Sequence, residues 1–243
     1  MIVNAGYRGK VGGDVLKFTY TGTYNIRDDG VMELLTSGVI TFNKPQLIDI
    51  FLVGGGSAPG RDSNNRSGSG GGGGGYTATF KSVTVKDSYN VTIGAGATAP
   101  SYGEGTAGGR TSFGTQFSVN GGAAGTTNYS QGQDGGSGGG GSGNGTGGRD
   151  GSGGGGWPAG KGQGHTTREF GESTGKLYAG GGGGGTDSSS KVNKGGEGGG
   201  GNGSLTGQSG TPNTGGGGGG SYQFTSRGGN GGSGIVCIRL HKE

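Results

Sequence analysis

The apolar residues of this chain are concentrated in short stretches that have the pattern of β-strands. β-branched and aromatic residues are frequent from Val15 to Tyr24, and the segment from Val31 to Phe42 contains two short candidate strands. Leu47 to Val53 is almost continuously apolar and is broken only by Asp49, which is typical of a strand buried on both faces. The apolar run from Ile235 to Leu240 predicts a last strand near the end of the sequence.

A further region of alternating apolar and polar residues begins at Tyr76. Tyr76 to Phe80 alternates regularly, and the apolar positions resume one step out of phase at Val83. This shift indicates a β-bulge near Lys81-Ser82. Asp87-Ser88 are turn residues in front of another alternating segment, Tyr89 to Ile93. We therefore predict a β-hairpin that turns at Asp87-Ser88.

Most of the remaining chain is dominated by glycine. All but seven of the 75 glycines lie between Gly54 and Gly234, and three runs, Gly70–Gly75, Gly180–Gly185 and Gly215–Gly220, are six residues long. Only 25% of the residues are hydrophobic and 14% are charged, whereas an average globular domain is about half apolar and a quarter charged. Such a chain is either disordered or folds by packing backbone against backbone.

Such a chain can pack backbone against backbone if it forms extended left-handed helices with three residues per turn. Such a helix has no internal hydrogen bonds, so each N–H and C=O group must find a partner on a neighbouring helix. Neighbours this close exclude Cβ atoms, and a helix surrounded on all sides needs glycine at every position. We therefore predict that the six-glycine runs lie at the centre of a bundle. Gly195–Gly198 and Gly228–Ser233, which carry occasional side chains, are predicted at its edge.

The predicted fold class is mostly irregular and all-β. It consists of a bundle of polyglycine II helices flanked by β-strands, with a small N-terminal β segment. We assign residues 1–46 to that segment, a possible attachment region, and residues 47–243 to the glycine-rich domain. The single cysteine, Cys237, lies in an apolar run and is predicted to be buried and inert. We expect no signal peptide, because residues 1–20 contain no apolar core flanked by a cleavage-like site. We expect no membrane insertion, because no apolar run of about 18 residues is present.

Sequence motifs for catalysis occur only as a result of the composition. Gly155–Lys161 fits the start of a phosphate-binding loop but is followed by Gly162, where Ser or Thr is required. Gly135–Gly139 satisfies G-x-S-x-G, but neither histidine, His165 or His241, has an obvious carboxylate to orient it. Zinc spacing and the repeat of calcium β-rolls are both missing. We therefore expect no enzymatic activity, no metal and no cofactor.

Several segments follow one another in an order that has a counterpart in a known family. They are Phe51–Gly56, the long run closing at Tyr76-Thr77, Val91–Gly96, Thr111–Gly114, Thr166–Glu172 with Leu177–Ala179, and Gly231–Val236. This order, over about residues 31–240, resembles the glycine-rich domain of bacteriophage tail proteins. The chain is also similar in architecture to the tail-fibre-tip adhesins of long-tailed phages. These resemblances imply polyglycine II bundles whose exposed loops contact receptors on the host surface.

The resemblance thus implies a virion protein of a phage tail that binds a bacterial cell-surface receptor, a glycan or an outer-surface protein, and docks onto other tail or fibre proteins. The recognition loops would be the polar excursions Thr126–Gln133, His165–Phe170, Asp187–Lys194 and Leu205–Thr214. The candidate contact residues are Tyr102, Tyr129, Trp157, His165, Arg168, Lys191 and Lys194. The three aromatic residues among them either stack on sugar rings or cap the bundle as its apolar edge.

Three other functions stay open at this point. The chain could be a purely structural virion component, a decoration or tail cap without host contact. An ice-binding protein would need a flat face of regularly spaced Thr or Ala, which these tracts lack. A disordered RNA-binding chain would repeat the RGG motif, which occurs once, at Arg227-Gly228-Gly229. We expect no nucleic-acid partner, and the formation of a homo-oligomer is left open.

Overall fold

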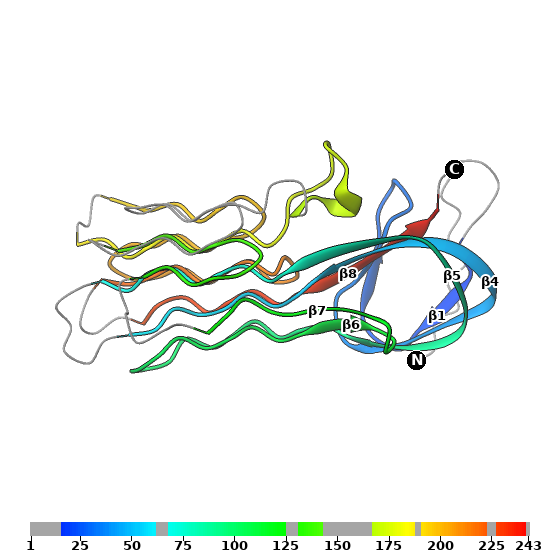
Figure 1. Cartoon of the computed structure of the whole chain (residues 1–243), viewed down its shortest axis with the longest axis horizontal. Helices are drawn as coiled ribbons and strands as arrows, with labels where there is room; N and C mark the ends of the chain where they lie inside the picture. The colour runs from blue at the N-terminus through cyan, green and yellow to red at the C-terminus, as the bar shows by residue number, and fades with distance from the viewer. Residues whose placement is uncertain are drawn as a thin grey trace.

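The computed structural model describes residues 16–61, 68–124, 131–142, 167–187, 191–222 and 227–241. Its strands form one antiparallel sheet of order β2-β3-β8-β4-β5-β6-β7, and β1 pairs with β4 outside this path (Figure 1). The strands are β1 (Phe18–Tyr20), β2 (Tyr24–Ile26), β3 (Met32–Leu34), β4 (Gly38–Val53), β5 (Thr77–Thr92), β6 (Thr111–Phe113), β7 (Phe117–Val119) and β8 (Ile235–Leu240). The only helix in the described part is the short 3-10 helix η2 (Glu169–Gly171). The predicted all-β class with an N-terminal β segment is confirmed.

The predicted bulge in β5 is confirmed by the register between β4 and β5. Ile48 pairs with Val83 and Ile50 with Phe80, so that Asp49 alone faces Lys81 and Ser82. Ser82 has a φ of 55°, in the left-handed region that serine rarely adopts. The bulge therefore places two residues of β5 opposite one residue of β4.

The predicted hairpin at Asp87-Ser88 is wrong. β5 continues through these residues, and Thr41 and Phe42 of β4 pair with Ser88 and Asp87. The irregularity is a second bulge between Phe42 and Gln46 of β4, beside Asp87, which has a φ of 67°. An aspartate in the left-handed region can occur in a turn or beside a bulge. Here β4 is long enough to pair with β5 on both sides of the irregularity, so a bulge forms instead of a turn.

Two apolar clusters cover opposite faces of the sheet around β4. Ile48, Ile50 and Leu52 belong to the larger cluster, whereas Phe51 and Val53 belong to the smaller one. Alternate residues of a strand point to opposite faces, so most of this strand end is buried on both sides, as predicted. The larger cluster also contains residues from β1 and β3, and the boundary suggested after residue 46 lies inside β4.

Beyond the sheet the chain runs back and forth in extended segments that lie side by side (Figure 1). All residues of the three six-glycine runs are buried. The runs are bonded to one another: Gly72 N–H donates to Gly218 O (2.7 Å), Gly182 N–H to Gly72 O (2.8 Å) and Gly220 N–H to Gly183 O (2.7 Å). The three longest glycine runs therefore form the centre of the bundle, as the sequence predicts.

Positions three residues apart in a run face the same neighbour. A Cβ added at Gly71 or at Gly74 would lie 2.0 Å from a carbonyl oxygen of segment 179–182. A Cβ at Gly70 would lie 2.0 Å, and one at Gly73 2.2 Å, from carbonyl oxygens of segment 131–134. This periodicity is that of a helix with three residues per turn, and it leaves no space for side chains.

The predicted edge segments are indeed at the edge. Glu197 within Gly195–Gly198 and Asn230 within Gly228–Ser233 are exposed. Their neighbouring glycines still bond inward, since Gly196 N–H donates to Gly181 O (2.7 Å) and Gly232 N–H to Gly216 O (2.7 Å). The exposed side chains of these two segments thus point to solvent, while their glycines face the bundle.

The amides of the central runs are expected to exchange very slowly with solvent. Gly72, Gly182 and Gly218 each donate to a buried carbonyl oxygen, so exchange requires opening of the bundle. We expect protection by roughly three orders of magnitude or more, measured by NMR hydrogen exchange. Exchange of these amides at the rate of an unstructured peptide would contradict the bundle.

Candidate functional site

The turns at the end of the bundle opposite the sheet form a surface that we call the far tip. The segment leaving β4 is paired with the end of the next segment by Gly54 N–H donating to Tyr76 O (2.9 Å). It reaches Arg61 seven residues later, which is about 22 Å at the rise of such a helix. The described parts of the far tip are Arg61 and residues 100–105, 186–187, 191–194 and 204–206 (Figure 1).

Tyr102 stands out on the far tip, with 65% of its side chain exposed. The Arg61 guanidinium carbon lies 4.8 Å from the centre of its ring, and Arg61 Nη1 donates to Ser101 O at 3.1 Å. Backbone bonds in both directions between Arg61 and Gly103, 2.7 and 2.8 Å long, hold the two turns together. Arg61 therefore lies against the Tyr102 ring at the surface of the far tip.

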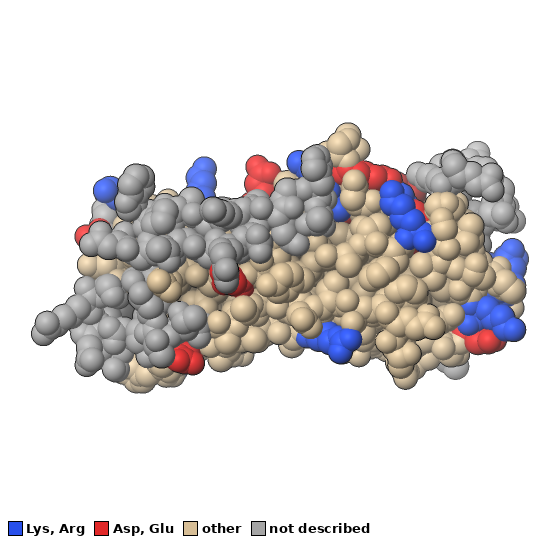
Figure 2. Space-filling model, in the orientation of Figure 1, with Lys and Arg blue, Asp and Glu red and all other residues tan. Residues whose placement is uncertain are grey.

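Lys191 and Lys194 are also exposed at this end of the molecule. Between them, Val192 is 56% exposed, and Asn193 is paired with Gly203 and donates from Nδ2 to Gly184 O at 2.7 Å. Asn193 therefore anchors the turn while its neighbours point outward. On the face drawn in Figure 2, the described charged residues are scattered among uncharged ones.

Two of the four predicted recognition loops need a different description. Leu205–Thr214 is not one loop: Leu205 lies at the far tip, where its O accepts from Tyr222 N–H (3.3 Å), and Thr214 O accepts from Ala179 N–H (2.7 Å) near the sheet. The residues between them run along the bundle, because Thr211 N–H donates to Gly199 O at 2.8 Å. Tyr129, Trp157 and His165, with residues 126–130, lie outside the described residues.

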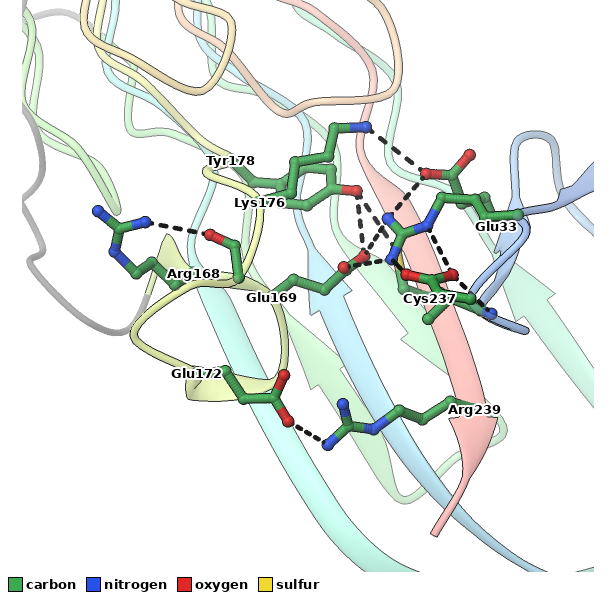
Figure 3. A network of polar contacts seen from close by, with 12 residues as sticks. Glu33, Arg168, Glu169, Glu172, Lys176, Tyr178, Cys237 and Arg239 are labelled. Carbon is green, nitrogen blue, oxygen red and sulfur yellow. Dashed lines mark hydrogen bonds and ion pairs between the residues drawn. The ribbon is translucent and has the colours of Figure 1, made fainter. Parts of the chain in front are cut away.

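The described part of the His165–Phe170 excursion lies on the sheet. Thr167, Glu169 and Phe170 are buried, and Arg168, half-buried, donates from Nη1 to Gly175 O at 3.1 Å (Figure 3). They begin a segment, residues 167–178, that we call the strap. Its 3-10 helix η2 lies over β5 and β4, and side chains of the segment contact Cys237 and Arg239 of β8 (Figure 3). Its side chains are therefore part of the packing between bundle and sheet.

Aromatic residues hold both ends of the strap against Phe51 of β4. The ring centres of Phe170 and Tyr178 lie 6.2 and 5.4 Å from that of Phe51. Glu169 N–H donates to Lys176 O at 2.9 Å, which closes the strap on itself. Cys237 lies beneath it, fully buried, and burial followed by the nearby Glu169 carboxylate raises the pKa of its thiol. The predicted buried cysteine is confirmed.

Ion pairs fasten the strap to the turn after β2. Arg27 binds the Glu169 carboxylate through both terminal nitrogens, at 2.7 and 3.0 Å, and also contacts Asp29 (2.8 Å) and Glu33 (3.3 Å). Burial would lower the pKa of Arg27, but the hydrogen bonds to Asp29 and Glu169 raise it. Burial would raise the pKa of Asp29, but the bonds from Arg27 and Val31 lower it. Arg27 and Asp29 therefore both stay charged at neutral pH.

A second ion pair fastens the other side of the strap. Arg239 of β8 contacts Glu172 at 2.7 Å, and its guanidinium carbon lies 4.1 Å from the centre of the Phe170 ring (Figure 3). A pocket of about 360 Å³ lies between the two ion pairs and is lined mainly by Arg27, Glu169, Phe170, Glu172, Lys176 and Arg239. Most of its charged groups are paired with one another. We therefore interpret the pocket as part of the contact between the strap and the sheet, not as a ligand site.

One expectation about histidine is overturned. His241 does have an orienting carboxylate, because its Nδ1 lies 2.6 Å from Oδ1 of the buried Asp49. The two residues are far apart in sequence and meet only through the pairing of β4 with β8. Asp49, the one charged interruption of an apolar strand, was the only signal in the sequence.

The described residues lack two features. They contain no group of three His, Cys, Asp or Glu residues placed to hold a metal ion. They also form no helix long and apolar enough to cross a membrane.

The chain matches a known protein family. The model of a family described as a glycine-rich domain covers residues 35–241. Comparison with curated proteins finds no match. The matched range begins before β4 and ends after β8, so it includes both the bundle and most of the sheet.

Proposed function

The chain belongs to the glycine-rich domain family, and from this premise we propose that it is a phage tail or tail-fibre-tip protein that binds a host receptor. The receptor would be a glycan or a protein of the bacterial surface, contacted by side chains of the far tip. The sheet end would dock onto other tail or fibre proteins of the virion.

One observation carries this proposal. In the central runs, a Cβ at almost any position would collide with a neighbouring backbone carbonyl, as at Gly182, where the distance to Gly218 O is 2.0 Å. The bundle is therefore fixed by its main chain and is indifferent to the side chains of its turns. A rigid frame with freely variable loops is the usual arrangement of recognition proteins.

The positions of the first and last described residues, Leu16 and His241, support the same proposal. The described chain begins with Leu16 in the apolar core of the sheet and ends with His241, whose N–H donates to Leu47 O at 3.0 Å. Both lie at the sheet end, opposite the far tip (Figure 1). Attachment at the sheet would therefore leave the far tip free to meet a cell surface.

Removal of three side chains at the far tip is expected to weaken receptor binding. In the variant Tyr102→Ala/Lys191→Ala/Lys194→Ala, we expect saturable binding to host cells to fall at least about tenfold, since each exposed anchor contributes on the order of 1 kcal/mol. The thermal midpoint should not change, because none of the three is buried. Binding of labelled protein to a panel of bacterial strains measures the effect.

The matched control removes two lysines at the opposite end. Lys44→Ala/Lys86→Ala changes exposed residues of β4 and β5 and should bind like the unmodified protein. If the far-tip variant bound host cells as well as the unmodified protein does, the far tip would not be the surface that contacts the receptor. Absence of saturable binding to every strain would favour the alternative, a structural virion component without host contact.

A further inference from the structure

The bulge between β4 and β5 brings together a serine, a histidine and an aspartate. Ser82 Oγ lies 2.9 Å from His241 Nε2, and His241 Nδ1 lies 2.6 Å from Asp49 Oδ1. Ser82 and Asp49 face each other across the bulge, and His241 directly follows β8, which pairs with the other side of β4. Three different segments of the sheet thus place one side chain each in a continuous hydrogen-bonded chain.

The order of atoms fixes the roles of the two imidazole nitrogens. A carboxylate can only accept hydrogen bonds, so the nitrogen facing Asp49, Nδ1, must carry a proton. In the neutral imidazole, Nε2 then has a lone pair and accepts a hydrogen bond from the Ser82 hydroxyl. This tautomer is the one that allows a histidine to act as a general base toward a serine.

Asp49 is held in its charged form. Burial would raise its pKa, but bonds from His241, the backbone N–H of Ser82 (3.1 Å) and Arg239 Nε (3.1 Å) lower it. The side chain is only 2% exposed. A buried, ionised and fully bonded carboxylate keeps the imidazole in one orientation.

Ser82 itself has the features of a nucleophile. It is exposed, and its φ of 55° is a strained conformation for a residue with a side chain. Such a conformation also holds nucleophilic serines at sharp turns, where the hydroxyl is presented to solvent. The bulge is what lifts this residue out of the regular alternation of β5.

We propose that Ser82 is a nucleophilic serine that attacks acyl esters, with His241 as the general base and Asp49 as the orienting residue. The bond from Ser82 Oγ to the acyl carbon forms while the proton of the hydroxyl passes to His241 Nε2. The ester C–O bond breaks, and the leaving alcohol takes that proton. Water then attacks the acyl carbon and gives a proton to His241 Nε2. The bond from Ser82 Oγ to the acyl carbon breaks, His241 returns the proton to Oγ, and a carboxylic acid is released.

The surroundings of the three residues limit the substrate. Ser82 lies open on the sheet, so the site suits a small acyl group, such as acetyl, on an accessible alcohol. The backbone N–H of Ser82 is committed to Asp49 and that of His241 to Leu47 O, and neither can stabilise an oxyanion. We therefore expect slow turnover, with covalent modification as the clearest signal. This activity is independent of receptor binding by the far tip.

The test is covalent labelling of the full chain by a fluorophosphonate, with the site located by mass spectrometry, together with hydrolysis of p-nitrophenyl acetate. We expect the label on Ser82. His241→Gln should lower the labelling rate by about a hundredfold or more, as expected for loss of a general base. Ser82→Gly should abolish the label while the fold is retained, since glycine accepts this φ without strain.

The matched control is Ser88→Ala. Ser88 is also exposed, lies close to the second bulge between β4 and β5, and has its Oγ 2.7 Å from Thr41 Oγ1, without a histidine. Labelling of this variant should equal that of the unmodified protein. Failure to label Ser82, or an equal rate in folded His241→Gln as shown by its circular dichroism, would overturn the proposal and leave a purely structural network.

Discussion

The replacement Gly72→Ala is expected to prevent folding of the bundle. The new methyl group would lie 2.2 Å from Ser57 O, far inside van der Waals contact. The chain cannot move aside, because Gly72 also donates to Gly218 O (2.7 Å) and accepts from Gly182 N–H (2.8 Å) on its other sides. We expect a loss of at least about 4 kcal/mol in the free energy of unfolding, measured by chemical denaturation, or recovery of the protein only in insoluble form.

The control for this change is Gly30→Ala in the turn between β2 and β3. A Cβ at Gly30 would have no atom within 4 Å, although its φ of 82° is unfavourable for alanine. The expected loss is only about 1–2 kcal/mol, the cost of the left-handed conformation. If Gly72→Ala were no more destabilising than Gly30→Ala, the bundle would not be held by backbone contact.

The second large effect is expected for Arg27→Ala, which removes the cation beneath the strap. The side chains of Glu169 and Glu33 are only 6% and 11% exposed, so their charges would lose their main partner. Loss of one member of a buried ion pair typically costs about 3–5 kcal/mol. We expect the strap to loosen and the buried thiol of Cys237 to react faster with iodoacetamide, which mass spectrometry can follow.

The matched control is Lys176→Ala. Lys176 also contacts Glu33, at 3.5 Å, but its side chain is 53% exposed, and such pairs contribute at most about 1 kcal/mol. The reactivity of Cys237 should then stay close to that of the unmodified protein. Equal effects of the two variants on stability and on the thiol would show that the Arg27 network does not hold the strap.

The sequence predicts the bundle well because the requirement for glycine applies to each position of the run by itself. A helix without internal hydrogen bonds and without room for Cβ requires glycine, so the three six-residue runs identify the centre directly. The strand Ile235–Leu240 and the bulge at Lys81-Ser82 follow in the same way from local patterns. Each of these features depends on a few neighbouring residues.

Features that depend on pairing between distant segments could not be predicted. Asp87 suits a turn or a bulge, and only the length of β4 decides between them. The excursion Leu205–Thr214 reads as a polar loop, but hydrogen bonds to other segments align its middle with the bundle. The contact between Asp49 and His241 needs the register of β8 on β4, which no local pattern provides.

The threefold rotation of the central helices restricts how such a protein can change in length during evolution. One inserted residue would rotate all later positions of that run by a third of a turn, and every N–H beyond it would point to a different neighbour. An insertion of three residues leaves the direction of every later N–H unchanged and only lengthens the bundle. Insertions and deletions are therefore expected at the turns, or inside the helices in multiples of three.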